Sequence, residues 1–573
     1  QAEDGIRDVE RSRGLGDVYK RQVIMFASVK LPSVRAWTPV EGHISQDTWW
    51  TVADSPYRLI GDVIIDAGVT LTIEPGVRVE ITDGHSLIIY GSLYAVGRTN
   101  AIINFTSSRR TPIPGAWEAI LFLGEKNESL LIEYSEISFA RIGINIQSNG
   151  KVIIRKTIIA NCSQAGIKVT DQSDCIIEEC NIMQEGNCIV NLGSKCSGLT
   201  IIDSNMSSDN DDVVLINGQG KTEASISNIV ILNSSILSDK RGIVLKIEVD
   251  EPGWMSPTYA YLNNITIKGN NIKSNDDGIF IYAKGQYTYT HNIDVKNNLI
   301  VSRRGIYAFT YAYSYAYSGH CKTYNFNILG NSIRSKTHAI YLESRAEDYR
   351  ASTYNLSIID NFLESEKDGI CIYAKSSGAQ IYDLQIKSNN IVTNQTGIYL
   401  HTISPYSTAH GATAYIYDIE ITYNSISALQ KGILVQSDAS AGSSYLYGIV
   451  ISYNHIISRQ GGIHLYSSAP TNAPDWYPSS AFLYNVTVLG NKMLFGEYGI
   501  YLRSDANRGK GYFYNVLIQN NLIIACSNIG LYIEANIYQN MSVYDINVLN
   551  LSLIHISEPT RPLYISYAVF CLK

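Results

Sequence analysis

Apolar and polar residues alternate with a period of two in short runs that recur along the chain from about residue 263 onwards. Each run starts at a Tyr, has apolar residues two and four positions later, and ends at an Asn seven positions after the Tyr. Alternation with this period predicts short β-strands, and no run shows the 3.6-residue period of a helix. The pairs are Tyr324/Asn331, Tyr354/Asn361, Tyr382/Asn389, Tyr417/Asn424, Tyr447/Asn454, Tyr484/Asn491 and Tyr514/Asn521.

A second apolar run starts at a Gly-Ile step eight positions after the Asn, and a variable polar insert separates it from the next Tyr. The Gly positions recur about every 27 to 37 residues, while Gly143, Gly166 and Cys188 mark repeats of about 22 residues upstream. A unit this small cannot bury its apolar face alone, so we expect the units to stack into one solenoid with two or three strands per coil. The steps include Asn270 to Gly278, Asn361 to Gly369, Asn389 to Gly397, Asn424 to Gly432, Asn454 to Gly462 and Asn491 to Gly499.

The stacking predicts a place for each repeated residue, because equivalent strands of neighbouring coils lie about 4.8 Å apart. The apolar residues after the Tyr should point inward and form aliphatic stacks. The Tyr has the same parity, so we expect its ring to cap one edge of the core with the hydroxyl at the surface. The Asn should stand at a turn and bond its equivalents above and below, giving a ladder.

These residues resemble the right-handed parallel β-helix of the pectate-lyase-like fold, which is marked by an Asn ladder and aliphatic stacks. The resemblance runs from about Tyr57 to Asn550 and implies an all-β chain with a single solenoid. The segment from Asp47 to Gly97 looks like the N-terminal part of secreted β-helix proteins. We therefore expect an N-terminal cap and first coils over residues 37–115 and β-helix repeats over residues 116–550.

The two ends of the chain, residues 1–22 and 551–573, resemble translated sequencing-adapter sequence. The resemblance implies that the natural segment is 23–550 and that its last repeat continued beyond it. The apolar run Val23-Ile-Met-Phe-Ala-Ser-Val, followed by small residues up to Ala36, predicts the end of a signal peptide. We expect a secreted, cell-surface or periplasmic protein, and no later stretch reaches the roughly 18 apolar residues of a membrane span.

The amino-acid composition argues against several classes of protein. The chain has 573 residues, a net charge of -7 and only 17% charged residues, which argues against a nucleic-acid binder and a coiled coil. There are 41 Tyr against 12 Phe and 6 Trp, so the aromatic content reflects a repeated position. Five cysteines fall between Cys162 and Cys196, without a Cys-x-x-Cys zinc motif. Cys175 should point inward as a small apolar residue, and one disulfide within this group is plausible in an exported chain.

Acidic residues on the outward side of the Tyr strands are the catalytic candidates. Asp383, Asp418 and Glu420 form the densest acidic group, with Lys387 nearby. Adjacent coils would place Asp383 and Asp418 about 5 Å apart, the carboxylate separation of a retaining glycosidase. Like charges at that distance would also separate their pKa values into an acid and a base. The alternative is a solvated face that Lys387 neutralises.

Other charged residues give weaker signals. Asp209, Asp211 and Asp212 could bind calcium at a turn, and we expect no other cofactor. His401 and His464 follow Gly-Ile steps and could face a groove, although surface histidines are the ordinary alternative. The residues before each Gly alternate in sign and predict an ion-pair ladder; they are Arg241, Asp277, Arg304, His338 and Asp368.

The variable inserts are the binding candidates. They comprise Tyr307–Ser318, Pro405–Tyr417 and Ala469–Tyr484, and we expect them to form loops along one side of the solenoid. Tyr, Ser and Ala in loops make adaptable recognition surfaces for a glycan or a protein, unless the loops pack against each other. The side chains singled out are Tyr311, Tyr313, Tyr315 and Trp476.

The sequence therefore predicts an exported surface binding or scaffold protein that presents a Tyr-rich loop face to a polysaccharide, a cell-surface glycan or a surface protein, and neither a nucleic acid nor a membrane. The first alternative is a polysaccharide lyase or glycoside hydrolase that acts on the outer face. The Gly-Ile and Asn-x-Ile coils also look like those of the periplasmic β-helix family associated with copper-site maturation of nitrous oxide reductase. That second alternative predicts metal ligands converging on one groove, and the sequence shows none.

Overall fold

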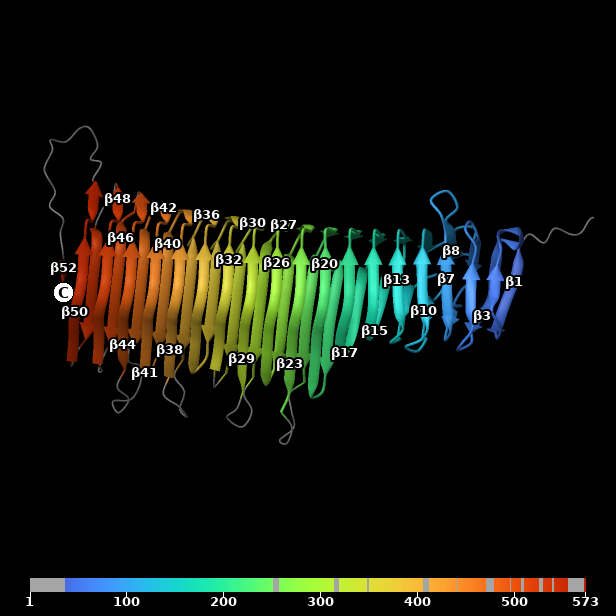
Figure 1. Cartoon of the computed structure of the whole chain (residues 1–573), viewed down its shortest axis with the longest axis horizontal. Helices are drawn as coiled ribbons and strands as arrows, with labels where there is room; N and C mark the ends of the chain where they lie inside the picture. Colours follow the sequence, from blue (N-terminus) through green and yellow to red (C-terminus); the bar gives the residue numbers. More distant parts are fainter. Residues whose placement is uncertain are drawn as a thin grey trace, which may run out of the picture.

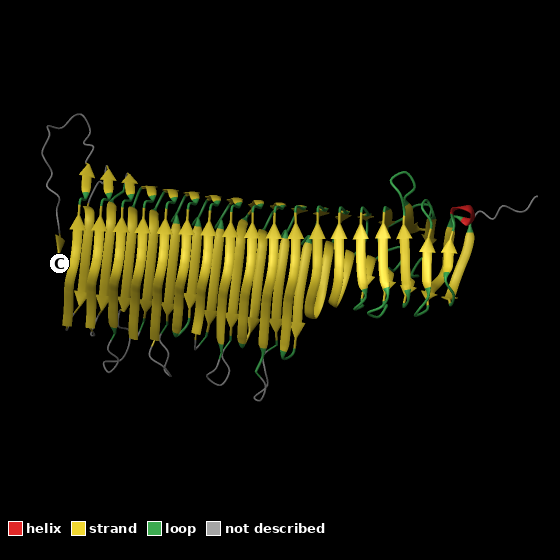
Figure 2. Cartoon of the chain, in the orientation of Figure 1, coloured by secondary structure: helices red, strands yellow, loops and turns green. Residues whose placement is uncertain are grey.

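The described part of the chain is a stack of coils, each of which adds one strand to each of three parallel sheets, here called A, B and C (Figures 1 and 2). The computed structural model describes residues 37–554 and 571–572, except 251–256, 314–318, 348–349, 406–411, 441, 470–478, 495, 507–509, 525–528 and 538–539. Every pairing between named strands is parallel; for example, Ile167 pairs with Ile189 and Ile463 with Ile500, so that these two coils measure 22 and 37 residues. The fold is a right-handed parallel β-helix, as the sequence predicts.

Sheet A contains the strands that carry the repeated Tyr. They are β2 (Thr48–Trp50), β4 (Thr70–Ile73), β7 (Ser92–Val96), β10 (Ser129–Glu133), β13 (Lys151–Arg155), β20 (Glu223–Leu232), β23 (Tyr259–Lys268), β26 (Tyr287–Lys296), β29 (His320–Leu329), β32 (Arg350–Ile359), β35 (Gly378–Lys387), β38 (Ala412–Thr422), β41 (Gly442–Ser452), β44 (Ser480–Leu489), β47 (Lys510–Gln519) and β50 (Asn540–Leu549).

Sheet B contains the short strands that follow the Asn corner. They are β5 (Arg78–Ile81), β8 (Ile103–Ser107), β11 (Ser135–Ser138), β14 (Ile158–Ala160), β16 (Asn181–Gln184), β18 (Asn205–Ser208), β21 (Ser235–Ser238), β24 (Asn271–Ser274), β27 (Leu299–Ser302), β30 (Ser332–Ser335), β33 (Phe362–Ser365), β36 (Asn390–Thr393), β39 (Ser425–Ala428), β42 (His455–Ser458), β45 (Lys492–Leu494), β48 (Leu522–Ile524) and β51 (Ser552–Ile554).

Sheet C contains the strands that begin at the Gly-Ile step. They are β6 (Leu87–Ile89), β9 (Ile120–Phe122), β12 (Ile142–Ile146), β19 (Val214–Gly220), β22 (Ile243–Val249), β25 (Asp277–Gly285), β28 (Arg304–Ala312), β31 (Ile340–Ala346), β34 (Ile370–Lys375), β37 (Ile398–Ser404), β40 (Lys431–Ala439), β43 (Gly461–Ala469), β46 (Tyr498–Ala506), β49 (Ile529–Ile537) and β52 (Cys571–Leu572).

Four strands bend and belong to two sheets each. β1 (Thr38–Ile44) and β3 (Tyr57–Ile65) run from sheet B into sheet C, and β15 (Ala165–Glu178) and β17 (Asn187–Ile202) run from sheet C into sheet A. One short 3-10 helix, η1 (Val52–Asp54), interrupts the first coils. None of the described residues forms a helix long and apolar enough to span a membrane.

The Asn residues form the predicted ladder at the corner between sheets A and B. Asn331 is 1% exposed; its Nδ2 donates to Oδ1 of Asn361 at 3.0 Å and to the Val295 carbonyl at 2.8 Å. The backbone N–H of Asn331 also donates to Asn361 Oδ1, at 2.9 Å. The same contacts recur from Asn270 to Asn521, so each amide satisfies backbone groups that the turn leaves without strand partners.

The Tyr residues do not cap the core, and that prediction was wrong. In β35, Ile381 and Leu384 are buried and point inward, whereas Tyr382 and Asp383 both face outward. Asp383 has φ 52°, in the left-handed region, and this residue interrupts the alternation so that the Tyr turns to the outside. The equivalent position has positive φ in the other coils, at Asn264, Asn292, Asn325, Asn355, Asp418, Gly448, Asn485, Asn515 and Asp545.

Outward tyrosines of successive coils stack on one another. The ring centroids of Tyr382 lie 4.7 Å from those of both Tyr354 and Tyr417, with the planes within 3° of parallel. Because both faces of each inner ring are covered by the next ring, the ladder presents ring edges and hydroxyls. The column comprises Tyr324, Tyr354, Tyr382, Tyr417, Tyr447, Tyr484, Tyr514 and Tyr544.

The long strands of sheets A and C face each other across a thin layer of small residues. Thr290 of β26, Thr310 of β28 and Thr323 of β29 form one chain of hydroxyl hydrogen bonds, at 3.1 and 2.9 Å. Arg304–Ala312 belongs to this layer as strand β28, so the prediction that a loop begins at Tyr307 was wrong. Its Tyr residues alternate with Ala and Thr because the narrow interior admits only small side chains.

The cysteine group is buried in the core. Cys175 is fully buried and pairs in register with Leu199, as predicted. Cys162, Cys175, Cys180 and Cys188 are free thiols, so no disulfide forms within the group. Burial raises the pKa of the thiols of Cys162 and Cys175 to about 12.

The first described strands already pair in register with the later coils, so residues 38–115 continue the same three sheets. At the other end, Ser552–Ile554 pairs with Leu522–Ile524. Residues 1–36 and 555–570 lie outside the described residues. The adapter and signal-peptide interpretations therefore stay predictions.

Candidate functional site

A groove follows the edge of sheet B where the chain turns into sheet C. It has a cavity volume of about 570 Å³ and crosses five successive coils, from β24 to β36. Since coils are about 4.8 Å apart, the groove is about 20 Å long and runs parallel to the solenoid axis. A linear groove with one set of side chains per coil results directly from the stacking.

Two rows of side chains form the walls of this groove, and four buried Ser residues form its floor. One wall comes from the outward position of each sheet B strand: Lys273, Val301, Arg334, Glu364 and Val392. The other wall comes from the turn that follows each strand: Asn275, Arg303, Lys336, Glu366 and Asn394. The floor residues are Ser274, Ser302, Ser335 and Ser365.

The floor hydroxyls are already engaged within the turns. Ser274 Oγ donates to the Asp277 carbonyl at 2.9 Å, and Ser302 Oγ donates to the Arg304 carbonyl at 2.6 Å. These bonds fix the turns that carry the second wall of the groove. The exposed wall side chains are therefore the groups that remain to contact a ligand.

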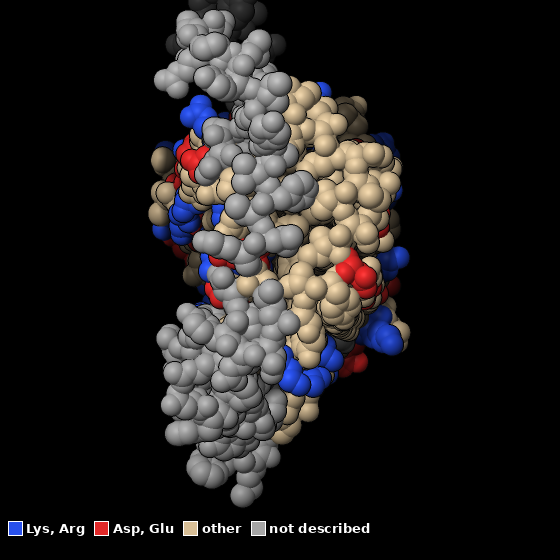
Figure 3. Space-filling model, turned by 90° about the vertical axis from the view of Figure 1, so that its left-hand side faces the viewer, with Lys and Arg blue, Asp and Glu red and all other residues tan. Residues whose placement is uncertain are grey.

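The wall charges are only partly paired. Arg303 Nη2 lies 2.5 Å from Asp276 Oδ1, and Arg334 Nε lies 2.8 Å from Glu364 Oε2. Lys273 forms no ion pair with any described residue, and neither does Lys336. Viewed along the axis from the left-hand end of Figure 1, basic and acidic side chains are interspersed around the solenoid (Figure 3).

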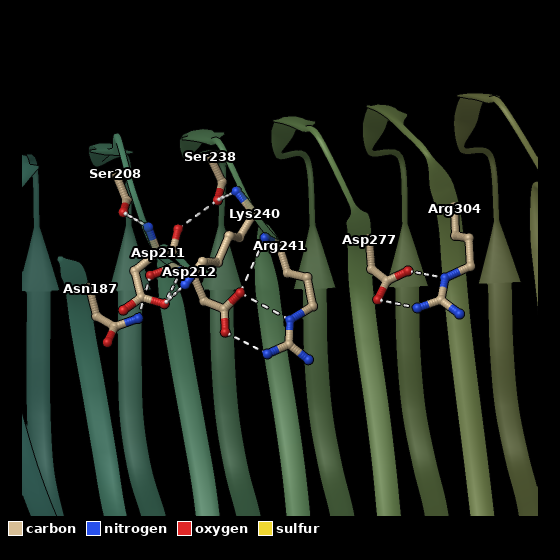
Figure 4. A network of polar contacts seen from close by, with 9 residues as sticks. All are labelled: Asn187, Ser208, Asp211, Asp212, Ser238, Lys240, Arg241, Asp277 and Arg304. Carbon is tan, nitrogen blue, oxygen red and sulfur yellow. Dashed lines mark hydrogen bonds and ion pairs between the residues drawn. The ribbon is translucent and has the colours of Figure 1, made fainter. Parts of the chain in front are cut away.

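A row of ion pairs lies beside the groove, at the residues that precede the Gly-Ile steps or the equivalent positions (Figure 4). The Arg304–Asp277 and His338–Asp368 pairs belong to the predicted ladder, whereas Arg241 pairs with Asp212. Arg241 Nη2 lies 2.7 Å from Asp212 Oδ2, and Arg304 binds Asp277 through two hydrogen bonds, of which the one to Oδ2 is 2.8 Å long. His338 Nε2 lies 3.4 Å from Asp368 Oδ2. These pairs join consecutive coils.

The same row accounts for two of the three residues proposed to bind calcium. Asp212 is paired with Arg241, and Asp211 Oδ1 lies 3.1 Å from Lys240 Nζ, whereas Asp209 is exposed. Within the described ranges, no group of three His, Cys, Asp or Glu side chains is placed to hold a metal ion. Calcium at this turn stays a prediction.

A polar network lies on the outer face of sheet C. The Tyr399 hydroxyl and His401 Nδ1 are 2.9 Å apart, and His401 Nε2 lies 2.8 Å from Asp438 Oδ2. Gln436 Nε2 donates to the same carboxylate oxygen at 2.7 Å. His401 is only 8% exposed, and burial raises the pKa of Tyr399 to about 12. The Gly-Ile position of His401 was a sequence signal for this network, but Asp438 belongs to the next coil and nothing in its sequence position relates it to His401.

His464 is a second buried histidine on sheet C. It is 8% exposed, and its Nε2 has no hydrogen-bond partner among the described residues. The ring fits because Gly461 has no side chain: a Cβ there would lie 1.8 Å from Nε2. Burial lowers the pKa of His464 to about 3, and the neighbouring Lys431, whose own pKa burial also lowers, adds to that shift.

The catalytic candidates lie elsewhere, on the exposed face of sheet A. Asp383 and Asp418 occupy equivalent positions on the neighbouring strands β35 and β38, and Glu420 is exposed two residues further on. The positive φ of Asp383 and Asp418 explains why a short Asp side chain stands at both positions. Lys387 lies 5.9 Å from the ring of Tyr423. None of the four lines the groove, and their catalytic role stays a prediction.

The binding candidates separate into two groups. The Tyr311 hydroxyl donates to Glu347, and Arg345 lies 6.0 Å from the ring. Tyr313 is 5% exposed, and its hydroxyl donates to the Asp250 carbonyl at 2.8 Å, so its ring is not an open recognition surface. Tyr315 and Trp476 lie outside the described residues.

One family-model comparison agrees with the fold over part of the chain. A family model described as "Right handed beta helix region" matches residues 118–318. No curated protein matches the chain. Among solved structures, the crystal structure of the periplasmic alginate epimerase AlgG is similar at 12% sequence identity and a TM-score of 0.29, over 75% of this chain and 85% of that one.

Proposed function

We propose that this chain is an exported binding protein whose groove along sheet B holds an extended glycan. The observation that carries the proposal is the groove itself, about 570 Å³ in volume and lined by five consecutive coils. A site that repeats every coil along a straight axis suits a polymer that also repeats along its length.

The wall chemistry supports a sugar ligand. Lys273 and Asn394 offer hydrogen-bond donors on the two sides, and Val301 and Val392 are 37% and 42% exposed. Polar groups at fixed positions around apolar patches are typical of small-molecule and glycan sites, because sugars present hydroxyl rims and apolar faces. The binding surface is thus proposed for the groove and not for the Tyr ladder, whose inner ring faces are covered.

A glycan array with the full chain tests this proposal, followed by titration of the best oligosaccharide. Val301→Trp places a large side chain in the groove and should abolish binding. Ile457→Trp is the matched control, because Ile457 occupies the same outward row on β42, is 38% exposed and does not line the groove. Equal loss in both variants, or no loss in either, would contradict the proposal.

A second candidate function is a polysaccharide lyase or glycoside hydrolase, favoured by the Tyr399–His401–Asp438 network. A hydroxyl on a histidine that a carboxylate orients is the usual arrangement for moving a proton. Product formation from glycan substrates by the unmodified chain, and its loss in His401→Gln, would support this activity. The same assay on Asp383→Asn, Asp418→Asn and Glu420→Gln tests the acidic residues of sheet A.

A further inference from the structure

We infer that the glycan in the groove carries an anionic group, a carboxylate or a sulfate, on alternate sugar residues. This inference rests on the proposed function and specifies the ligand of the same groove. Four observations carry it: the local charge, the pairing of that charge, the spacing of the unpaired groups and the acidic fourth coil of the groove.

The local charge is opposite to that of the chain. The whole sequence has a net charge of -7, yet the groove walls bring together four basic and two acidic side chains. Concentrating basic groups on an acidic protein favours an anionic ligand at this place over the rest of the surface. A neutral glycan could accept hydrogen bonds from these side chains but would gain no net charge attraction from them.

The pairing identifies the groups available to a ligand. Arg303 and Arg334 already have carboxylate partners, at 2.5 and 2.8 Å. Lys273 and Lys336 are exposed and have no carboxylate partner among the residues that the structure describes. Their ammonium groups are therefore the two contacts left for external anions.

The spacing of the two unpaired lysines indicates how often the anionic groups recur along the ligand. Lys273 stands on the strand wall at β24, and Lys336 stands on the opposite wall after β30, two coils further on, so their separation along the axis is about 10 Å. That distance is comparable with one disaccharide unit of an extended chain. Val301 stands on the coil between them and presents an apolar surface where an uncharged residue would lie.

The fourth coil of the groove limits the anionic stretch. Glu364 and Glu366 stand on the next coil, after Lys336, and Glu366 is exposed. The alternation places an uncharged sugar residue beside Glu366, where a ligand carboxylate would be repelled, and the anionic residues beside β24 and β30. This arrangement gives the site a direction along the axis.

The probes are a hyaluronan octasaccharide, which carries a carboxylate on every second residue, and the same oligomer with its carboxylates methyl-esterified. We expect the full chain to bind the carboxylated oligomer, with weaker affinity at higher salt, and the esterified oligomer at least tenfold more weakly. Lys273→Met and Lys336→Met should each weaken binding about three- to tenfold. Lys492→Met is the control, because Lys492 is exposed on sheet B outside the groove.

The outcomes separate this inference from the proposed function. If a neutral glycan binds, Val301→Trp blocks it and the two Lys variants do not weaken it, the groove binds glycan and the anionic inference is overturned. Equal binding of the carboxylated and esterified oligomers also overturns it. If neither hyaluronan nor any array glycan binds, the proposed function fails together with the inference.

Discussion

Asn298 and Asn331, 33 residues apart in the sequence, are joined across consecutive coils by a 2.9 Å hydrogen bond from Nδ2 to Oδ1. The backbone N–H of Asn298 donates to the same oxygen, also at 2.9 Å. Each Asn of the ladder therefore bonds to groups of two coils and holds them in register, so loss of one side chain should affect two coils.

Asn331→Ala should destabilise the protein by about 3 kcal/mol or more, because it leaves two donors of Asn298 and the Val295 carbonyl buried without partners. Denaturant unfolding measures this loss. Asn390→Ala is the control, since Asn390 is exposed on β36. A change in Asn331→Ala no larger than in the control would show that the ladder contributes little.

The left-handed backbone at Asp383 gives a second prediction. Asp383→Asn and Asp383→Gly should keep the stability within about 0.5 kcal/mol, whereas Asp383→Val should cost about 1–2 kcal/mol, because a β-branched residue avoids positive φ. Gln385→Val, two residues further along the same face, should be tolerated.

The comparison is measured by thermal unfolding, and it also serves the catalytic hypothesis. Since Asp383→Asn retains the fold, any glycan turnover that it abolishes belongs to the carboxylate. Equal stability of the Val and Gly variants would contradict the conformational explanation for Asp at this position.

The repeat could be predicted from the sequence because it depends on local rules. Alternation predicts strands, Asn marks a turn, and a short unit requires stacking, so the ladder around Asn331 and the inward Leu384 follow directly. The outward turn of Tyr382 could not follow from alternation, since one left-handed residue reverses the parity. The Asn, Asp or Gly after each Tyr was the available signal.

The candidate site could be predicted less well than the repeat, because part of it consists of contacts between different coils. The His401–Asp438 contact joins residues from two coils at positions that are not equivalent in the repeat. The ion pairs before the Gly-Ile steps were predictable because those residues occupy equivalent positions of the repeat. Equivalent positions of neighbouring coils lie next to each other in a solenoid. A contact between non-equivalent positions, such as that of His401 with Asp438, does not recur along the chain, so the sequence repeat does not predict it.

The tyrosine ladder should make the protein sensitive to alkali. Burial, with a further contribution from neighbouring tyrosines, raises the pKa of Tyr354 and Tyr484 to about 12. Above the ordinary Tyr pKa of about 10 the unfolded chain loses these protons while the folded chain keeps them, so stability falls as pH rises from about 10 to about 12.

Unfolding in denaturant across this pH range, with tyrosinate absorbance recorded in parallel, checks the prediction. Tyr354→Phe retains the stacked ring and removes one ionisable group, so its stability should fall less steeply. Tyr90→Phe, at an exposed position outside the ladder, should behave as the unmodified protein does. Identical alkaline slopes in all three proteins would contradict the assignment.

His464 gives the corresponding prediction in acid. Its folded pKa of about 3 lies below the ordinary value of about 6.5, because burial and Lys431 both disfavour the imidazolium. Between these two values the unfolded chain binds a proton that the folded chain does not, so stability should fall as pH decreases from about 6.5 towards 3. His464→Phe should reduce this slope, because it keeps an aromatic ring against Tyr501, which now lies 5.2 Å away. His455→Phe, at an exposed position, is the control, and an unchanged acid slope in His464→Phe would mean that His464 is not a source of the acid sensitivity.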